Sequence, residues 1–187
     1  MRRELARRIA LAFLGVVASG CLVTSTQEFS EPAPTPPYLS AGDASPPLGR
    51  LIVVRDPRRP ITFSTLVQSE DAGREVEAHL VADDVAAVPP NILAVAFAPA
   101  GRLNQRGRLL SVTWNPLSPS PTLGARLERG CHPITLLASH GFNYGSNRPV
   151  SADDRDFLVW WVLVGDRSDP TYVDTVLATG GCPTEAR

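Results

Sequence analysis

The chain has 187 residues, a formal net charge of −1 at pH 7 and 43% hydrophobic residues, with 18 prolines and 14 glycines. A chain of this length has room for one domain with a substantial core, and hardly for two. All 18 basic residues are arginine, and they form no basic stripe. The composition therefore argues against a nucleic-acid partner, because a protein that neutralises phosphates needs such a stripe.

The first 21 residues have the organisation of an export signal. Four arginines precede an uncharged run, residues 9–20, which ends in Ala18-Ser19-Gly20 directly before Cys21. The run is shorter than the roughly 20 residues of a membrane span and has the length of a signal-peptide core. Its ending resembles the lipobox of bacterial lipoproteins, although Ala18 stands where that motif usually has Leu. The alternative is an ordinary secretory signal in which Cys21 has no special role.

The lipobox resemblance implies that residues 1–20 are removed and that Cys21 receives lipid, with palmitate among its acyl chains. Because Leu22 and not Asp follows the cysteine, the resemblance to bacterial sorting rules implies the outer membrane. The expected partners are the membrane, through the anchor, and an envelope protein or polysaccharide. The mature chain has 14 basic and 18 acidic residues.

A proline-rich segment separates this anchor from the rest of the chain. The run Glu31-Pro32-Ala33-Pro34-Thr35-Pro36-Pro37 favours extended polyproline geometry, because proline lacks a backbone N–H. We predict that residues 21–49 are the lipid anchor and a disordered tether, and that residues 50–187 form one folded domain.

Cys131 and Cys182 remain as an even pair once Cys21 is assigned to the lipid. In an oxidising compartment such a pair predicts a disulfide, and two free thiols are the alternative. Neither cysteine has a second Cys or His at the spacing of a zinc site. We therefore expect neither a metal nor a cofactor.

Short alternating or β-branched runs follow, separated by Pro- and Gly-rich turns. The predicted strands are 51–54, 61–68, 75–82, 91–98, 108–114, 130–140 and 156–164. The turn chemistry of residues 69–73 predicts that 61–68 and 75–82 pair as a hairpin. A short helix is expected from Asp169-Pro170 to Gly180. This pattern predicts an all-β fold, an antiparallel β-sandwich of about seven strands.

The end of the chain strengthens this interpretation. The strand that begins Gly130-Cys131-His132, the polar loop after it, and the Trp160-Trp161 strand before Gly165-Asp166 resemble the last two strands of immunoglobulin-like or cadherin-like modules in bacterial surface lipoproteins. The resemblance implies an immunoglobulin-like sandwich and a binding or structural module, not an enzyme.

The strand 156–164 is apolar on both faces, so both faces need a cover. One face is predicted to fill the core and consists of Phe157, Val159 and Trp161. The other consists of Leu158, Trp160 and Val162. We expect the C-terminal segment to cover this second face. Otherwise the second face is the candidate partner surface.

Catalytic and metal-binding residues are sparse. Ser139 and His140 are adjacent, and neighbours in a strand point to opposite faces, so they do not form a nucleophile–base pair. The aspartates are interpreted as solvated turn residues, with calcium ligation as the alternative; they are Asp83, Asp84, Asp153, Asp154 and Asp156. The alternative function is a cryptic envelope hydrolase that uses His140 and this Asp-rich loop.

Overall fold

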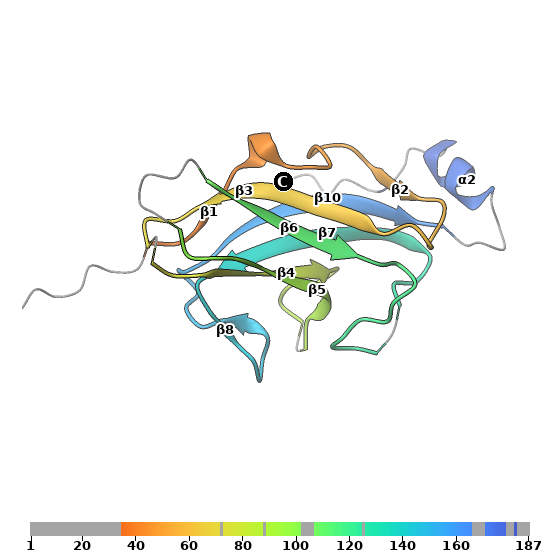
Figure 1. Ribbon diagram of the computed structural model, residues 1–187. Coiled ribbons are helices and arrows are strands. Elements are labelled where there is room, and N and C mark those ends of the chain that lie inside the picture. The colour runs from red at the N-terminus through yellow and green to blue at the C-terminus, as the bar shows by residue number, and fades with distance from the viewer. Residues whose placement is uncertain are drawn as a thin grey trace, which may run out of the picture. The chain divides into compact units, whose positions relative to one another are not determined.

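The computed structural model describes residues 35–71, 73–87, 89–101, 107–124, 126–165, 171–178 and 182 (Figure 1). All of them lie in the second of two compact units, Pro34–Arg187. The proposed signal, Cys21 and both ends of the predicted helix lie outside the described residues. Within the described ranges, no helix is long and apolar enough to cross a membrane.

The described chain is mostly β-structure, as the sequence predicts, and its strands form two main sheets and a hairpin. The first sheet has the order β1 (Tyr38–Leu39), β3 (Ile61–Gln68), β6 (Arg108–Trp114). The second has the order β2 (Ile52–Val54), β10 (Asp156–Val164), β7 (Gly130–Ser139), β4 (Val76–Ala82), β5 (Asn91–Ala98). The hairpin joins β8 (Phe142–Asn143) and β9 (Arg148–Pro149). A 3₁₀ turn, η1 (Ala41–Asp43), and a helix, α2 (Tyr172–Ala178), complete the described elements. Strand neighbours are antiparallel except β2 and β10, which are parallel.

The two main sheets pack face to face around one core (Figure 1). The three-stranded sheet contributes Phe63, Val67, Leu110, Val112 and Trp114. The five-stranded sheet contributes Val76, Ala78, Leu80, Ile134, Leu136 and Ala138. These are the inward positions that the alternation predicts, because successive side chains of a strand point to opposite faces.

The predicted hairpin between β3 and β4 is wrong. β3 pairs with β1 and β6, whereas β4 pairs with β5 and β7 in the other sheet. Alternation is compatible with both arrangements, because two apolar faces are buried equally well side by side or opposite each other. The chain therefore crosses between the sheets at the turn where a hairpin was expected.

The assignment of the two faces of β10 is also wrong. Leu158, Trp160 and Val162 are buried in the core between the sheets, with 8%, 1% and 0% exposure. They therefore do not form a partner surface. Phe157, predicted to be in the core, points outward and is 52% exposed. Both faces are apolar, so the pattern could not identify the face that meets the other sheet.

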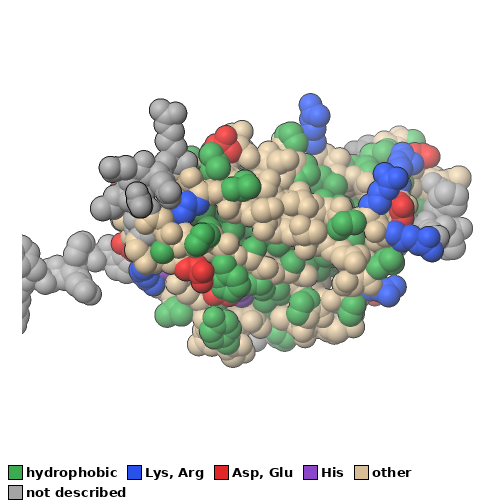
Figure 2. Space-filling view, viewed as in Figure 1, with side chains coloured by type: hydrophobic (Ala, Val, Ile, Leu, Met, Phe, Trp, Pro, Cys, Tyr) green, Lys and Arg blue, Asp and Glu red, His purple; other side chains and the backbone are tan. Residues whose placement is uncertain are grey.

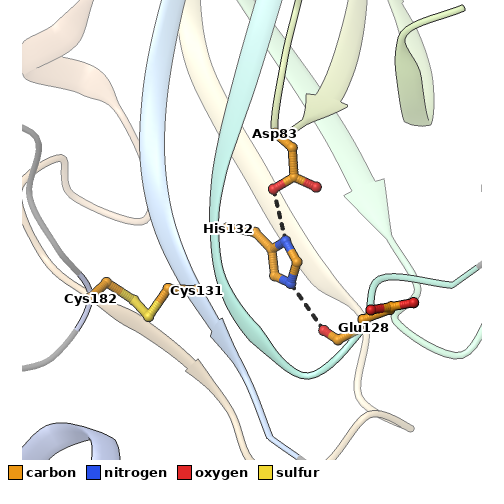
Figure 3. Close-up of a disulfide and its surroundings, with 5 residues drawn as sticks. All are labelled: Asp83, Glu128, Cys131, His132 and Cys182. Atoms are coloured by element: carbon orange, nitrogen blue, oxygen red, sulfur yellow. Dashed lines mark hydrogen bonds and ion pairs between the residues drawn. A yellow bond between two sulfur atoms is a disulfide. The ribbon is translucent and has the colours of Figure 1, made fainter. Parts of the chain in front are cut away.

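The C-terminal segment covers β10, but not on the face that was predicted. It packs against the outward face of β10, near the end of that strand. Leu163 and Val173 are fully or almost fully buried there together with Cys182, and Trp161, Tyr172 and Val176 pack around them. The predicted disulfide is confirmed, since Cys131 at the start of β7 is bonded to Cys182 (Figure 3). Gly165 permits this close packing, because a Cβ there would lie 2.8 Å from Cγ2 of Val173.

The folded domain begins before the predicted boundary at residue 50. Leu39 is 2% exposed, and its N–H donates to Oδ2 of Asp156 at 2.7 Å. Ser45 forms a β-bridge with Ser64 in β3. Residues from Tyr38 onward thus belong to the folded domain, although the sequence predicts that residues 38–49 are part of the tether.

Candidate functional site

A pocket of about 470 Å³ lies on the outer face of the five-stranded sheet. Its floor consists of Val81 from β4, Thr135 and Leu137 from β7, and Phe157 and Val159 from β10. Phe157 pairs with Leu137 and Val159 pairs with Thr135, which places these side chains together on one face. The volume is in the range of small-molecule sites, and most of the floor is apolar.

The β8–β9 hairpin forms one wall of the pocket, and the turn at residues 84–86 forms another. Arg148 of β9 donates to the carbonyl oxygen of Ala86, which joins the two walls. On the same sheet face, Phe142 of β8 stacks on His79 with ring centroids 3.7 Å apart and is itself 4% exposed. The hairpin is therefore held over the sheet at both of its strands, and the walls are built into the fold.

Three charged residues line the pocket. Oδ1 of Asp84 accepts the N–H of Ala86 at 2.7 Å and stabilises the turn. Arg155 is exposed, and among the described residues its side chain has no hydrogen-bond or ion-pair partner. With Arg148, the lining has two cations and one anion.

A buried polar pair lies on β4, beside the β8–β9 hairpin. His79 Nε2 is 2.7 Å from Oε1 of Glu77, and the two side chains are 3% and 9% exposed. The carboxylate oxygen accepts, so Nε2 donates, and Nδ1 of His79 has no hydrogen-bond partner in the part of the chain that the structure describes. Neither residue lines the pocket.

A second constellation joins Ser69, His140 and Asp154. Ser69 Oγ lies 2.7 Å from Nε2 of His140, whose Nδ1 lies 2.6 Å from Oδ1 of Asp154. This is the connectivity of a Ser-His-acid triad, with the acid on Nδ1 and the hydroxyl on Nε2. The sequence pointed to His140 and the Asp-rich loop but not to Ser69, which is 71 residues from His140 and reaches it only through the β3–β4 connection.

The same contacts also have a structural explanation. The His140 side chain is 0% exposed, and Ser69 Oγ accepts the N–H of Asp71 at 3.1 Å. Asp154 Oδ2 accepts the N–H of His140 at 3.2 Å and the hydroxyl of Ser139 at 3.3 Å. The network thus ties together three connections, those after β3, after β7 and before β10.

A third histidine lies next to the disulfide in sequence (Figure 3). His132 Nδ1 is 2.8 Å from Oδ1 of Asp83, and its Nε2 is 3.0 Å from the carbonyl oxygen of Glu128. Both oxygens are acceptors, so both bonds form when both ring nitrogens carry a proton. Cys131 and His132 point to opposite sides of β7 (Figure 3), so the histidine and the disulfide form separate contacts.

Four of the five aspartates considered as calcium ligands have other hydrogen-bond partners, and the fifth, Asp153, is exposed. Asp83 contacts the ring of His132, and Asp84 accepts the backbone N–H of Ala86. Asp154 contacts the ring of His140, and Asp156 accepts the backbone N–H of Leu39. Across the described ranges, no group of three or more His, Cys, Asp or Glu side chains is placed to hold a metal ion.

Apolar side chains are also exposed outside the pocket. Val95 and Phe97 of β5 are 43% and 51% exposed. Figure 2 shows hydrophobic side chains, in green, over the region of β4, β5 and β8, while several arginines, in blue, lie toward the end that carries α2. Val95 and Phe97 are not among the residues that line the pocket.

A scan against protein-family models and a search of curated proteins found no match for this chain. Its function is therefore inferred from two features of the described residues, the outer-face pocket and the Ser69–His140–Asp154 network.

Proposed function

We propose that this chain is a lipid-anchored, non-catalytic binding module of the cell envelope, attached to the outer membrane through Cys21. The observation that carries the binding function is the outer-face pocket. Its floor comes from three adjacent strands, and Arg148 joins its two walls. Such a site needs little rearrangement to accept a ligand, which favours binding.

The membrane anchor rests on residues 1–21 alone. In the full-length chain expressed in a bacterial host, Cys21→Ser is expected to abolish incorporation of labelled palmitate and to release the protein from the membrane fraction. Cys131→Ser is the matched control, because it removes a cysteine of the folded domain and leaves the lipobox intact. Labelling of Cys21→Ser at the level of the unaltered chain would refute the anchor.

An immunoglobulin-like domain is the proposed fold family. The strand orders support it, because β1-β3-β6 correspond to strands A, B and E, and β10-β7-β4 correspond to G, F and C. β5 then takes the place of an additional C′ strand beside C. The disulfide departs from the antibody pattern, because Cys182 lies beyond the last strand.

Cross-linking in intact cells tests the pocket. A photoreactive amino acid at position 157, which lines the pocket, is expected to capture an envelope protein or polysaccharide. The matched control carries it at position 109, on the three-stranded sheet, where Leu109 is 67% exposed. Val159→Phe, which fills the pocket, should abolish the position-157 product. A product that persists at full yield with Val159→Phe contradicts binding in the pocket.

A second candidate is an envelope hydrolase, and the Ser69–His140–Asp154 contacts favour it. In this proposal Ser69 Oγ attacks an acyl carbonyl while His140 Nε2 takes its proton, and Asp154 stabilises the imidazolium. The bond to the leaving group breaks, and the leaving group takes the proton from Nε2. Water, deprotonated by His140, then attacks the acyl-serine, and the proton passes from Nε2 to Ser69 Oγ as the ester bond breaks. The products are the free acid and the leaving alcohol or amine.

A fluorophosphonate probe tests this second candidate. Hydrolase activity predicts that the folded protein is labelled at Ser69 and that Ser69→Ala and His140→Gln lose the label. Ser111→Ala, on an exposed position of β6, is the control and should retain it. If the native protein is not labelled, the hydrolase proposal is refuted, and the Ser69–His140–Asp154 network has only a structural role.

A further inference from the structure

We infer that the outer-face pocket selects an anionic amphiphile, a molecule with one apolar body and one carboxylate or phosphate group. The inference rests on the proposed function of the pocket and specifies the chemistry of its ligand. Two sets of lining residues carry it, the apolar floor and the arginines.

The floor fits an apolar body. Val81, Leu137, Phe157 and Val159 present hydrocarbon to the pocket, and Thr135 supplies the one hydroxyl among these floor residues. A ligand that covers this floor removes apolar surface from water, including that of the half-exposed Phe157 ring. An uncharged sugar would leave most of its hydroxyls without partners on such a floor, which costs binding free energy.

The arginines fit an anion. Arg155 is exposed and has no hydrogen-bond or ion-pair partner among the described residues, so its guanidinium is available to a ligand. Arg148 also donates to Ala86, but a guanidinium has five N–H donors and retains others. A guanidinium matches the two oxygens of a carboxylate or phosphate, and the apolar floor beside it strengthens the attraction.

The remaining charge does not cancel this preference. Asp84 is the one acidic residue of the lining, and its Oδ1 accepts the N–H of Ala86. The lining therefore has a net charge of +1, from two arginines and one aspartate. A cationic ligand would be repelled, and a neutral ligand would form no ion pair with Arg155.

Two fluorescent dyes that differ by one anionic group provide the test. N-phenyl-1-naphthylamine is neutral, and 1-anilinonaphthalene-8-sulfonate has the same rings with a sulfonate. Titrated into the folded chain, the sulfonate is expected to bind about fivefold to tenfold more tightly, the scale of one partly solvated charge-assisted hydrogen bond. Decanoate and decyl phosphate should displace it, and inorganic phosphate alone should not.

Matched variants assign the effect to the pocket. Arg155→Gln should remove the preference for the sulfonate and leave binding of the neutral dye unchanged, whereas the exposed Arg58→Gln should change neither. Val159→Phe should weaken both dyes, and Val95→Phe, outside the pocket, should weaken neither.

The outcomes separate the inference from the proposed function. Equal affinities for the two dyes, with both lost in Val159→Phe, would overturn the anion selectivity and retain a binding pocket. Displacement by inorganic phosphate alone would overturn the requirement for an apolar body. Binding that Val159→Phe leaves intact, or no binding of either dye, would overturn the pocket itself.

Discussion

The indole ring of Trp160 packs edge-on against the ring of Phe63, with centroids 5.1 Å apart and an angle of 62° between the planes. The two residues belong to different sheets, β10 and β3, so the contact joins the layers. Trp160 Nε1 also donates to the carbonyl oxygen of Pro46 at 2.7 Å. One side chain therefore holds both sheets and the segment that precedes β2.

Trp160→Phe should lower the free energy of unfolding by about 2 kcal/mol. The change leaves the Pro46 carbonyl without its donor and leaves unfilled volume in the core. Trp161→Phe is the matched control, since Trp161 is only partly buried and lies outside the central core. Urea unfolding of the two variants measures the difference, and an equal loss for both would contradict the role given to Trp160.

Reduction of the Cys131–Cys182 bond should lower the free energy of unfolding by about 4 kcal/mol in the chain-entropy model, because the bond closes a loop across 51 positions. The sheets should remain folded, since neither cysteine lies in the central core. Thermal unfolding followed by circular dichroism, with and without reductant, measures the change. The double variant Cys131→Ala, Cys182→Ala should match the reduced protein; global unfolding on reduction would contradict the independence of the core.

His79→Phe should destabilise the domain by about 2 to 4 kcal/mol. It leaves the carboxylate of Glu77 buried without its partner, although Phe can still stack on Phe142. Adding Glu77→Leu to His79→Phe should recover much of the loss, because an apolar pair needs no hydrogen bond. A double-mutant cycle in urea measures the coupling, and strictly additive losses would show that the two residues act separately.

Asp154→Ala should destabilise the domain by about 2 to 4 kcal/mol, because it removes the acceptor of three donors, the ring and N–H of His140 and the hydroxyl of Ser139. Asp153→Ala is the matched control at an exposed neighbouring position and should change stability by less than about 0.5 kcal/mol. Hydrogen exchange should also rise in residues 69–71 for Asp154→Ala alone. Unchanged exchange there would contradict the connection through His140.

Arg55→Gln should leave stability unchanged within error. Arg55 pairs with Asp174 of α2 at 2.8 Å, but both side chains are more than half exposed. The hydrogen bond and charge of Asp174 raise the pKa of Arg55 above its ordinary value, so the cation persists throughout the neutral range. A raised pKa adds stability that is lost only when the pH rises through it. Unfolding at pH 6 and pH 9 should therefore show no contribution from titration of Arg55.

The local pattern of residues was sufficient for seven of the ten described strands and for most of their inward faces, but it did not predict the two-residue strands β1, β8 and β9. Phe63, Leu80, Leu110 and Leu136 are buried as the alternation predicts, because the direction of a side chain follows from its place in a strand. The cysteine pairing was also predictable, since an even pair remained after Cys21 was assigned to the lipid.

The same pattern could not predict which strands pair with each other or which face of β10 meets the core. β4 lies in the sheet opposite β3, and Trp160 rather than Trp161 faces the core, because alternation and apolarity on both faces are satisfied by either arrangement. The pocket and the contact between Ser69 and His140 join segments far apart in the chain. Such contacts depend on which surfaces pack together in the folded domain. A local pattern of residues does not determine that packing.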